Sequence, residues 1–245
     1  MSHLHIPDGI LPPILWIWGL ILSALALLVS SRAARRAGQR QIAFQSALGG
    51  IMLAVMAIPV PIAAFDYCMT LAGPVGVLLG AAPAFQVSFV VTLILALLGQ
   101  GGFTVVGLNT LVLGLGAITA RPVYLRVVRR LGPARAMAVA TAVSQLFSTM
   151  CWCALLVLSV RLTPNGVPNH EVEHTLIEVW HRVGAAVVIP LLLVAVALEA
   201  LLGYGLAHFL ARVRPDLLPG PATAAAAGPV AAPSTPGVPK VPRVL

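Results

Sequence analysis

Apolar runs of about 20 residues, the length of one helical crossing of a bilayer, constrain this chain more than any other feature. The first run, from Ile10 to Val29, contains no charged residue. Charged residues make up 9% of the 245 residues, whereas soluble domains average about 25%. A spanning helix satisfies its own backbone hydrogen bonds inside lipid. The chain is therefore predicted to be an all-α integral membrane protein.

The candidate crossings are five clear apolar segments and one ambiguous stretch. The clear segments cover residues 10–30, 42–60, 107–120, 134–160 and 183–211. The stretch 71–98 is long for one crossing, and a proline inside a helix breaks or kinks it. Pro83 therefore divides the stretch into a short inward leg, about 71–83, and a return leg, about 84–98. A re-entrant pair is an alternative with the same parity.

The basic residues predict the orientation, because Lys and Arg near membrane ends collect in the cytoplasm. They form two interior clusters: Arg32, Arg35, Arg36 and Arg40, and then Arg121, Arg126, Arg129, Arg130 and Arg135. Both clusters lie in the cytoplasm only if an even number of crossings separates them. Dividing the stretch 71–98 into two legs makes that number even. We therefore expect about seven transmembrane helices, one of them short or re-entrant. The N-terminus lies outside and the C-terminus inside.

This topology gathers acidic and imidazole groups on the outer face, where they attract cations. These residues are Asp8, Asp66, Glu171, Glu173, Glu178, His3, His5, His170 and His174. His170 and His174 share one face of a segment, 169–182, that is also typical of a solvated surface helix. The domain division is an N-terminal metal-binding segment (1–9), a transmembrane bundle (10–214) and a disordered Pro/Ala-rich cytoplasmic tail (215–245).

The opening MSHLHIPDG can chelate a metal through an amine, backbone nitrogens and an imidazole. Such nitrogen sets suit nickel(II) and copper(II). If Met1 stays, His3 is the third residue. If Met1 is removed, Ser2 supplies the amine and His3 is the second residue. The alternative is that this segment is a solvated tail whose histidines bind no metal.

Three segments resemble the CbiM/NikM family, the substrate-binding membrane components of energy-coupling-factor transporters for cobalt and nickel. They read HIPDGIL (5–11), GQGGFTVVGLNTLVLGLG (99–116) and IPLLLVAVALEALLGYGL (189–206). The resemblance covers about residues 5–210. It implies that an N-terminal amine and the histidine that matches His5 bind one divalent ion, and that the N-terminal segment inserts into the bundle as a plug.

The sequence departs from the family pattern at two ligand positions. Four residues precede His5, so His3, His5 or both are candidate ligands with Ser2. The family's outer-loop histidine has no counterpart in PIAAFDYCMTLAG (61–73), where Asp66, Cys68 and Met69 are the nearest substitutes. Sulfur ligands shift preference toward copper(I) or zinc. Cys68 is thus a candidate metal ligand, and packing as a small apolar side chain is the alternative.

Polar side chains elsewhere are expected to support these ligands rather than bind the ion. Asp8 and Asp66 lie beside them in the sequence. Gln100 stands where the family often has histidine, and Asn109 matches a family asparagine. Both amides either fix the plug or cap helix ends. Glu199 lies inside the last span, where an ionisable group is costly, and we expect it to pair with another element of the bundle.

The first hypothesis is therefore a transporter subunit that captures Co²⁺ or Ni²⁺ as its substrate in a bacterial inner membrane. No GxxxxGK[ST] phosphate loop occurs, so ATP hydrolysis would reside in partner ATPase subunits acting with a membrane coupling subunit and a possible small accessory subunit. The second hypothesis is a non-transporting membrane metal sensor or copper-handling protein. An enzyme is disfavoured because no nucleophile–base cluster occurs within the spans.

Overall fold

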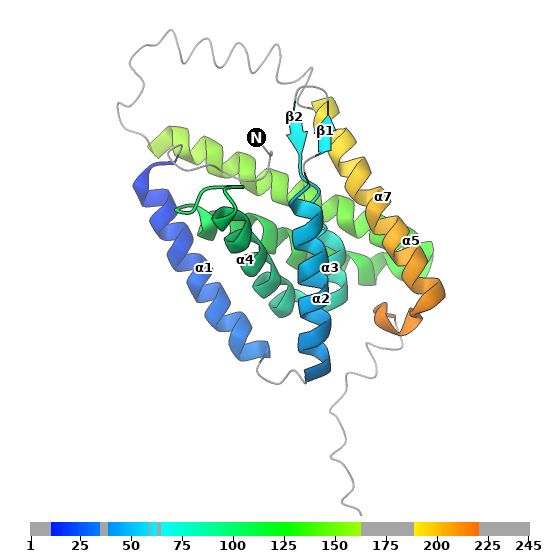
Figure 1. The fold of residues 1–245 in the computed structure, drawn as a ribbon. Coiled ribbons are helices and arrows are strands. Elements are labelled where there is room, and N and C mark those ends of the chain that lie inside the picture. Colours follow the sequence, from blue (N-terminus) through cyan, green and yellow to red (C-terminus); the bar gives the residue numbers. More distant parts are fainter. Residues whose placement is uncertain (1–10, 35–38, 59, 63–64, 163–188, 221–245) are drawn as a thin grey trace, which may run out of the picture.

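The computed structural model describes residues 11–34, 39–58, 60–62, 65–162 and 189–220, and Figure 1 shows them as a bundle of helices with one short hairpin. The helices are α1 (Pro13–Ala34), α2 (Gln39–Met56), α3 (Ala72–Leu79), α4 (Ala81–Leu97), α5 (Val106–Leu162) and α7 (Ile189–Val213), followed by the 3-10 turn η2 (Pro215–Leu217). Strands β1 (Val60–Ile62) and β2 (Phe65–Tyr67) pair antiparallel between α2 and α3. The helical fold class is confirmed, with this hairpin as a small addition.

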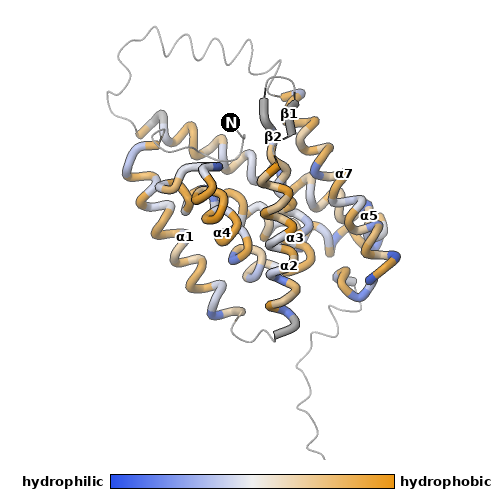
Figure 2. The backbone as a smooth tube through the Cα atoms, in the orientation of Figure 1, coloured by the Kyte–Doolittle hydropathy of each residue, from blue (hydrophilic) through white to orange (hydrophobic). Residues whose placement is uncertain are grey.

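Three helices in the described ranges, α1, α5 and α7, are long and apolar enough to cross a membrane, and α2 and α4 contribute shorter apolar helices. Large apolar side chains on α1 point outward, and Trp18 and Val29 remain 56% and 67% exposed. Figure 2 shows hydrophobic residues along both α1 and α7. Exposed apolar surface of this extent is expected for helices that face lipid. The number of crossings and their orientation stay predictions.

The helix α5 is two helices joined at a sharp bend. Gly132 has φ 75° and ψ 167°, outside the helical region, and the next residue is Pro133. Glycine adopts this positive φ without steric cost, and proline fits the first turn of the helix that follows. The basic cluster from Arg121 to Arg135 was expected to form a loop between two spans, but the structure continues the helix through Arg121 and Arg130. Arginine and leucine are good helix formers, so only the glycine interrupts the helix.

The short helix α3 lies in the middle of the bundle, against α4, α5 and α7. All of its residues except Leu78 are buried. Eight residues rise only about 12 Å, too little for a crossing, which agrees with a short or re-entrant leg. The predicted break at Pro83 was wrong by three residues. The chain breaks at Gly80, with φ 83°, and Pro83 sits in the first turn of α4, where a proline needs no donor.

Small residues let α3 approach its neighbours closely. A Cβ atom placed on Gly76 would lie 1.9 Å from the carbonyl oxygen of Ala117 on α5. A Cβ atom on Gly73 would lie 2.6 Å from the Cα atom of Thr141. Both distances are far below van der Waals contact, so the packing of α3 against α5 requires glycine at these positions.

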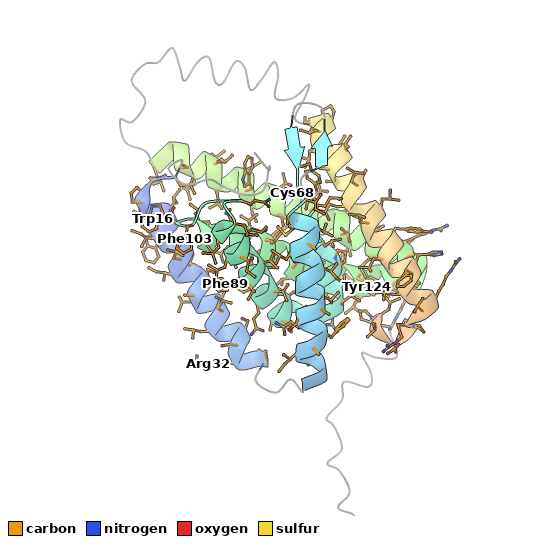
Figure 3. All side chains as sticks on the ribbon, viewed as in Figure 1. Trp16, Arg32, Cys68, Phe89, Phe103 and Tyr124 are labelled. Atoms are coloured by element: carbon orange, nitrogen blue, oxygen red, sulfur yellow. The ribbon has the colours of Figure 1, made fainter. Side chains whose placement is uncertain are left out.

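The two ends of the bundle differ in what they carry. Figure 3 shows Arg32 at the end of α1 that lies away from the β1–β2 hairpin, whereas Cys68 and Phe103 lie toward the hairpin end. Beyond α7, the chain continues into η2, and Leu218 belongs to a buried apolar cluster that also contains Tyr124 and Met137. The disordered tail was expected to begin at residue 215, but η2 follows α7 directly and Leu218 is buried in the bundle. The remainder of that predicted tail lies outside the described residues.

Candidate functional site

A buried carboxylate on α7 forms the centre of the polar network at the hairpin end. Glu199 has no exposed surface. Its Oε1 atom accepts hydrogen bonds from the Tyr67 hydroxyl at 3.3 Å and from the Thr70 amide, and its Oε2 atom accepts one from the Leu71 amide at 3.3 Å. An ionised carboxylate only accepts hydrogen bonds, and three donors directed at it match that chemistry. The predicted pairing of Glu199 with another element is confirmed.

A second buried amide extends this network to α5. The Gln145 side chain donates from Nε2 to the Tyr67 hydroxyl at 3.3 Å. Burial, followed by the charge of Glu199 and the hydrogen bond to it, raises the pKa of the Tyr67 phenol. The phenol therefore stays protonated and donates to the carboxylate. We call Tyr67, Thr70, Leu71, Gln145 and Glu199 the Glu199 latch, since it joins α5, α7 and the chain that enters α3.

The backbone at the entry to α3 explains why a carboxylate is needed there. Leu71 has a left-handed φ of 51°, a conformation that costs a non-glycine residue roughly 1–2 kcal/mol. The first amides of a helix also lack partners within the helix. Glu199 satisfies the amides of Thr70 and Leu71, and the Thr70 hydroxyl accepts a bond from the Ala72 amide at 3.3 Å. Negative charge at a helix N-terminus is favourable.

The candidate ligand Cys68 lies within this latched segment, directly after Tyr67. Its side chain is 8% exposed and is not in a disulfide. Met69, next to it, is half-buried. Asp66 is in β2, where its backbone pairs with Pro61. The structure thus places Cys68 and the backbone of Asp66 at the hairpin end of the bundle (Figure 3), and that this end faces the outside stays a prediction.

The two amides singled out in the sequence occupy different surroundings. The Gln100 side chain donates from Nε2 to the Ala57 carbonyl oxygen, just past the end of α2, at 3.2 Å. This contact matches the helix-end alternative for Gln100. Asn109 is buried, 4% exposed, in the first turns of α5. Next to it, the Thr110 and Thr92 hydroxyls form a 2.7 Å hydrogen bond between α5 and α4.

Several predicted site residues lie outside the described residues, namely Ser2, His3, His5 and Asp8, and so do the outer-face residues His170, Glu171, Glu173, His174 and Glu178. Within the described ranges no group of three His, Cys, Asp or Glu side chains converges as a metal site. His208, in α7, stacks on Tyr204 with ring centroids 5.8 Å apart. The described part of the chain therefore supplies at most a fraction of any ligand set.

Sequence reasoning did not single out Tyr67, Thr70 or Gln145. Gln145 carried a signal, since an uncharged amide inside an apolar run needs a partner when it is buried. Tyr67 carried a weaker one, as an aromatic with a hydroxyl beside Cys68. Neither signal identifies the partner, because Tyr67 and Glu199 are 132 residues apart in the chain.

Two solved structures have a similar fold. One is described as the crystal structure of a truncated transition metal transporter, with a TM-score of 0.69, 20% identity, and coverage of 84% of this chain and 98% of that chain. The other, a transition metal transporter, has a TM-score of 0.70, 20% identity, and coverage of 85% and 93%. The two TM-scores show a shared architecture, and at 20% identity the likeness extends to the fold alone.

The sequence match identifies the family. Residues 5–217 match the family model CbiM, described as the cobalt uptake substrate-specific transmembrane region, and the chain therefore belongs to the CbiM family. It is 31% identical over 240 residues to the cobalt transport protein CbiM of Geobacter sulfurreducens. The match covers 94% of this chain and 66% of that relative, so this chain spans just under two thirds of the relative's length. The family consists of transport components, which supports the non-enzymatic interpretation of the sequence.

Proposed function

We propose that this chain is the membrane subunit that captures cobalt(II) or nickel(II) for import by an energy-coupling-factor transporter. The observation that carries the proposal is the match of residues 5–217 to a family of cobalt-uptake membrane regions. That range begins at His5 and includes every member of the Glu199 latch. Capture takes place at the hairpin end of the bundle, away from Arg32.

The ion is bound first by the N-terminus. The amine of Met1 or Ser2, backbone nitrogen and the imidazole of His3 or His5 form a nitrogen set that suits a square-planar or tetragonal divalent ion. Cys68 provides the remaining ligand in place of a histidine. Its position within the Glu199 latch supports this role, because the latch fixes the backbone on both sides of it.

Other polar groups support the ligands. Asp8 and Asp66 add negative charge, which favours a cation. Asn109, buried near the start of α5, supplies a hydrogen-bonding amide beneath the plug. Gln100 holds the α4–α5 connection to the end of α2 and so frames the mouth of the bundle.

Transport depends on topology and on partners. The chain crosses the bacterial inner membrane about seven times, with residues 1–9 outside and the tail from residue 221 inside. The sequence lacks a phosphate-binding loop, so a pair of ATPase subunits hydrolyses ATP. A membrane coupling subunit, with or without a small accessory membrane subunit, transmits that work to the bundle.

Equilibrium binding of Co²⁺ and Ni²⁺ to the purified full chain tests the proposal. His3→Ala, His5→Ala and Cys68→Ala are compared with Cys151→Ala, a cysteine in the second half of α5. We expect loss of a ligand to weaken binding by at least about tenfold, or about 1.4 kcal/mol, and Cys151→Ala to have no effect. Unchanged affinity in both histidine variants would refute capture by the N-terminus.

The alternative function is a membrane metal sensor or copper-handling protein that does not transport. The absence of histidine from residues 61–73 and the presence of Cys68 favour it, because a thiolate prefers copper(I) or zinc. Uptake of Co²⁺ or Ni²⁺ into vesicles that contain the chain and its ATPase and coupling partners discriminates between the two. Copper(I) affinity lost only in Cys68→Ala, without uptake, would establish the alternative.

A further inference from the structure

The segment 67–71 joins β2 to α3, and only its first residue, Tyr67, belongs to a strand. Residues 68–71 have a defined shape without secondary structure to maintain it. Its last residue, Leu71, has a left-handed φ of 51°. A non-glycine residue keeps this conformation only when its surroundings hold it. The cause of the shape must therefore lie in contacts from other elements.

Glu199 supplies those contacts from α7. All three hydrogen bonds that it accepts come from this segment: the Tyr67 hydroxyl, the Thr70 amide and the Leu71 amide. Within the described ranges, no Lys or Arg forms an ion pair with it. Both carboxyl oxygens accept, one of them from two donors, and hydrogen bonds are stronger in a buried, low-dielectric site than in water. The segment is thus held mainly by one carboxylate.

The attachment points lie on both sides of the candidate cargo ligand. Tyr67 precedes Cys68, and Thr70 follows Met69, so only two residues separate the attachment points. Consecutive Cα atoms are about 3.8 Å apart, which leaves those two residues little freedom. Gln145 adds a second tie, because its amide donates to the Tyr67 hydroxyl and fixes it toward Glu199.

We infer that Glu199 is a positioning residue for the captured metal: its carboxylate sets the place and rigidity of segment 67–71, and through it the ligand that this segment brings to the ion. The inference rests on the proposed function. It assigns Glu199 no contact with the metal. It requires a negatively charged side chain at residue 199 that only accepts hydrogen bonds. A neutral side chain of the same shape should not hold the segment in place.

Two substitutions at one position separate charge from shape. Glu199→Gln keeps the volume but turns one acceptor into an NH₂ donor that faces the backbone donors. Glu199→Asp keeps the charge and both acceptors but is one methylene shorter. Ser148→Ala is the matched control, since the Ser148 hydroxyl is buried and donates to the Val112 carbonyl oxygen at 3.1 Å, which is not part of the latch, although Ser148 lies one helical turn after Gln145.

The measurements are Co²⁺ affinity, the thermal midpoint, and amide hydrogen exchange of a peptide over 65–72 compared with one over 84–92. For Glu199→Gln we expect affinity to fall at least about tenfold and exchange to accelerate in 65–72 alone. Glu199→Asp should retain more affinity than Glu199→Gln, and Ser148→Ala should bind within about twofold of the unmodified chain. A role in packing alone predicts the reverse order, with Gln near the unmodified chain and Asp impaired. That order, or unchanged affinity in a folded Glu199→Gln variant, would overturn the inference.

If Glu199→Gln does not fold, Tyr67→Phe tests the same idea, because it removes one donor and leaves two. It should weaken Co²⁺ binding by roughly two- to fivefold and accelerate exchange in 65–72, and no change in either would overturn the inference. The two proposals fail separately. If the unmodified chain binds neither Co²⁺ nor Ni²⁺, the proposed function is wrong, and hydrogen exchange alone then decides whether Glu199 holds the segment.

Discussion

The contact between Gly76 on α3 and Ala117 on α5 gives the sharpest prediction for stability. A Cβ atom at residue 76 would lie 1.9 Å from the Ala117 carbonyl oxygen, whereas a carbon and a carbonyl oxygen approach to about 3.3 Å. The obstacle is backbone in the neighbouring helix, so α3 must move by more than an ångström. Segment 67–71 would move with it, because it leads directly into α3.

The magnitude of the Gly76→Ala effect follows from two opposed terms. Alanine favours a helix over glycine by about 1 kcal/mol, whereas overpacking of a tight core costs typically 1–3 kcal/mol. A backbone clash belongs at the upper end, so we expect a net loss of about 2 kcal/mol. Gly50 in α2 is the control, because nothing lies within 4 Å of a Cβ atom there. Gly50→Ala should gain up to about 1 kcal/mol.

The assay is thermal unfolding of the two variants in the same detergent. A difference of about 3 kcal/mol between them corresponds to roughly 6–12 °C in Tm for a chain of this size. Gly76→Ala should have the lower Tm and also the weaker Co²⁺ binding. Equal Tm values for Gly76→Ala and Gly50→Ala would refute the close packing of α3 against α5.

Two further predictions concern Tyr67 and Leu218. The raised pKa of Tyr67 means that the folded chain keeps the phenolic proton where the unfolded chain, with an ordinary pKa of about 10, loses it. Stability should therefore fall as the pH rises above about 10, and Tyr67→Phe should lessen that fall in alkaline unfolding curves; an unchanged slope would contradict the buried Tyr67–Glu199 contact. Leu218→Ala should cost about 2 kcal/mol, because Leu218 is buried in one apolar cluster with Tyr124 and Met137. Leu217→Ala, at a half-exposed neighbour, should cost less, and equal Tm values would place residue 218 outside the folded bundle.

Hydropathy and charge predicted the helices of this fold well, because lipid imposes long apolar runs. The runs that became α1, α4 and α7 were all recognised, and so was the need to divide 71–98. The position of that division was wrong because proline is tolerated in the first turn of a helix. The residue that breaks the chain is Gly80, whose positive φ leaves no periodic signal in the sequence.

The site was predictable only in part, for a related physical reason. An acidic residue within an apolar run is costly, and this marked Glu199 from the sequence alone. The donors that offset the cost are mostly backbone amides, of Thr70 and Leu71, and every residue carries such an amide. The sequence therefore shows that a partner must exist without identifying it.

The Glu199 latch also reduces the number of side-chain groups in segment 67–71 that are available as metal ligands. The Tyr67 hydroxyl donates to Glu199 and accepts from Gln145, and the Thr70 hydroxyl accepts from the Ala72 amide. The two side-chain hydroxyls of the segment thus take part in hydrogen bonds within the protein. On the proposed function, the side-chain ligands that the segment offers are the sulfur atoms of Cys68 and Met69, which are softer ligands than imidazole. If the chain captures nickel(II) or cobalt(II) with such a segment, its selectivity for these ions must come from the nitrogen atoms of the N-terminus. If the N-terminus binds the metal only weakly, the same segment would favour copper(I). The comparison of His3→Ala and His5→Ala with Cys68→Ala therefore tests which end of the site determines the metal.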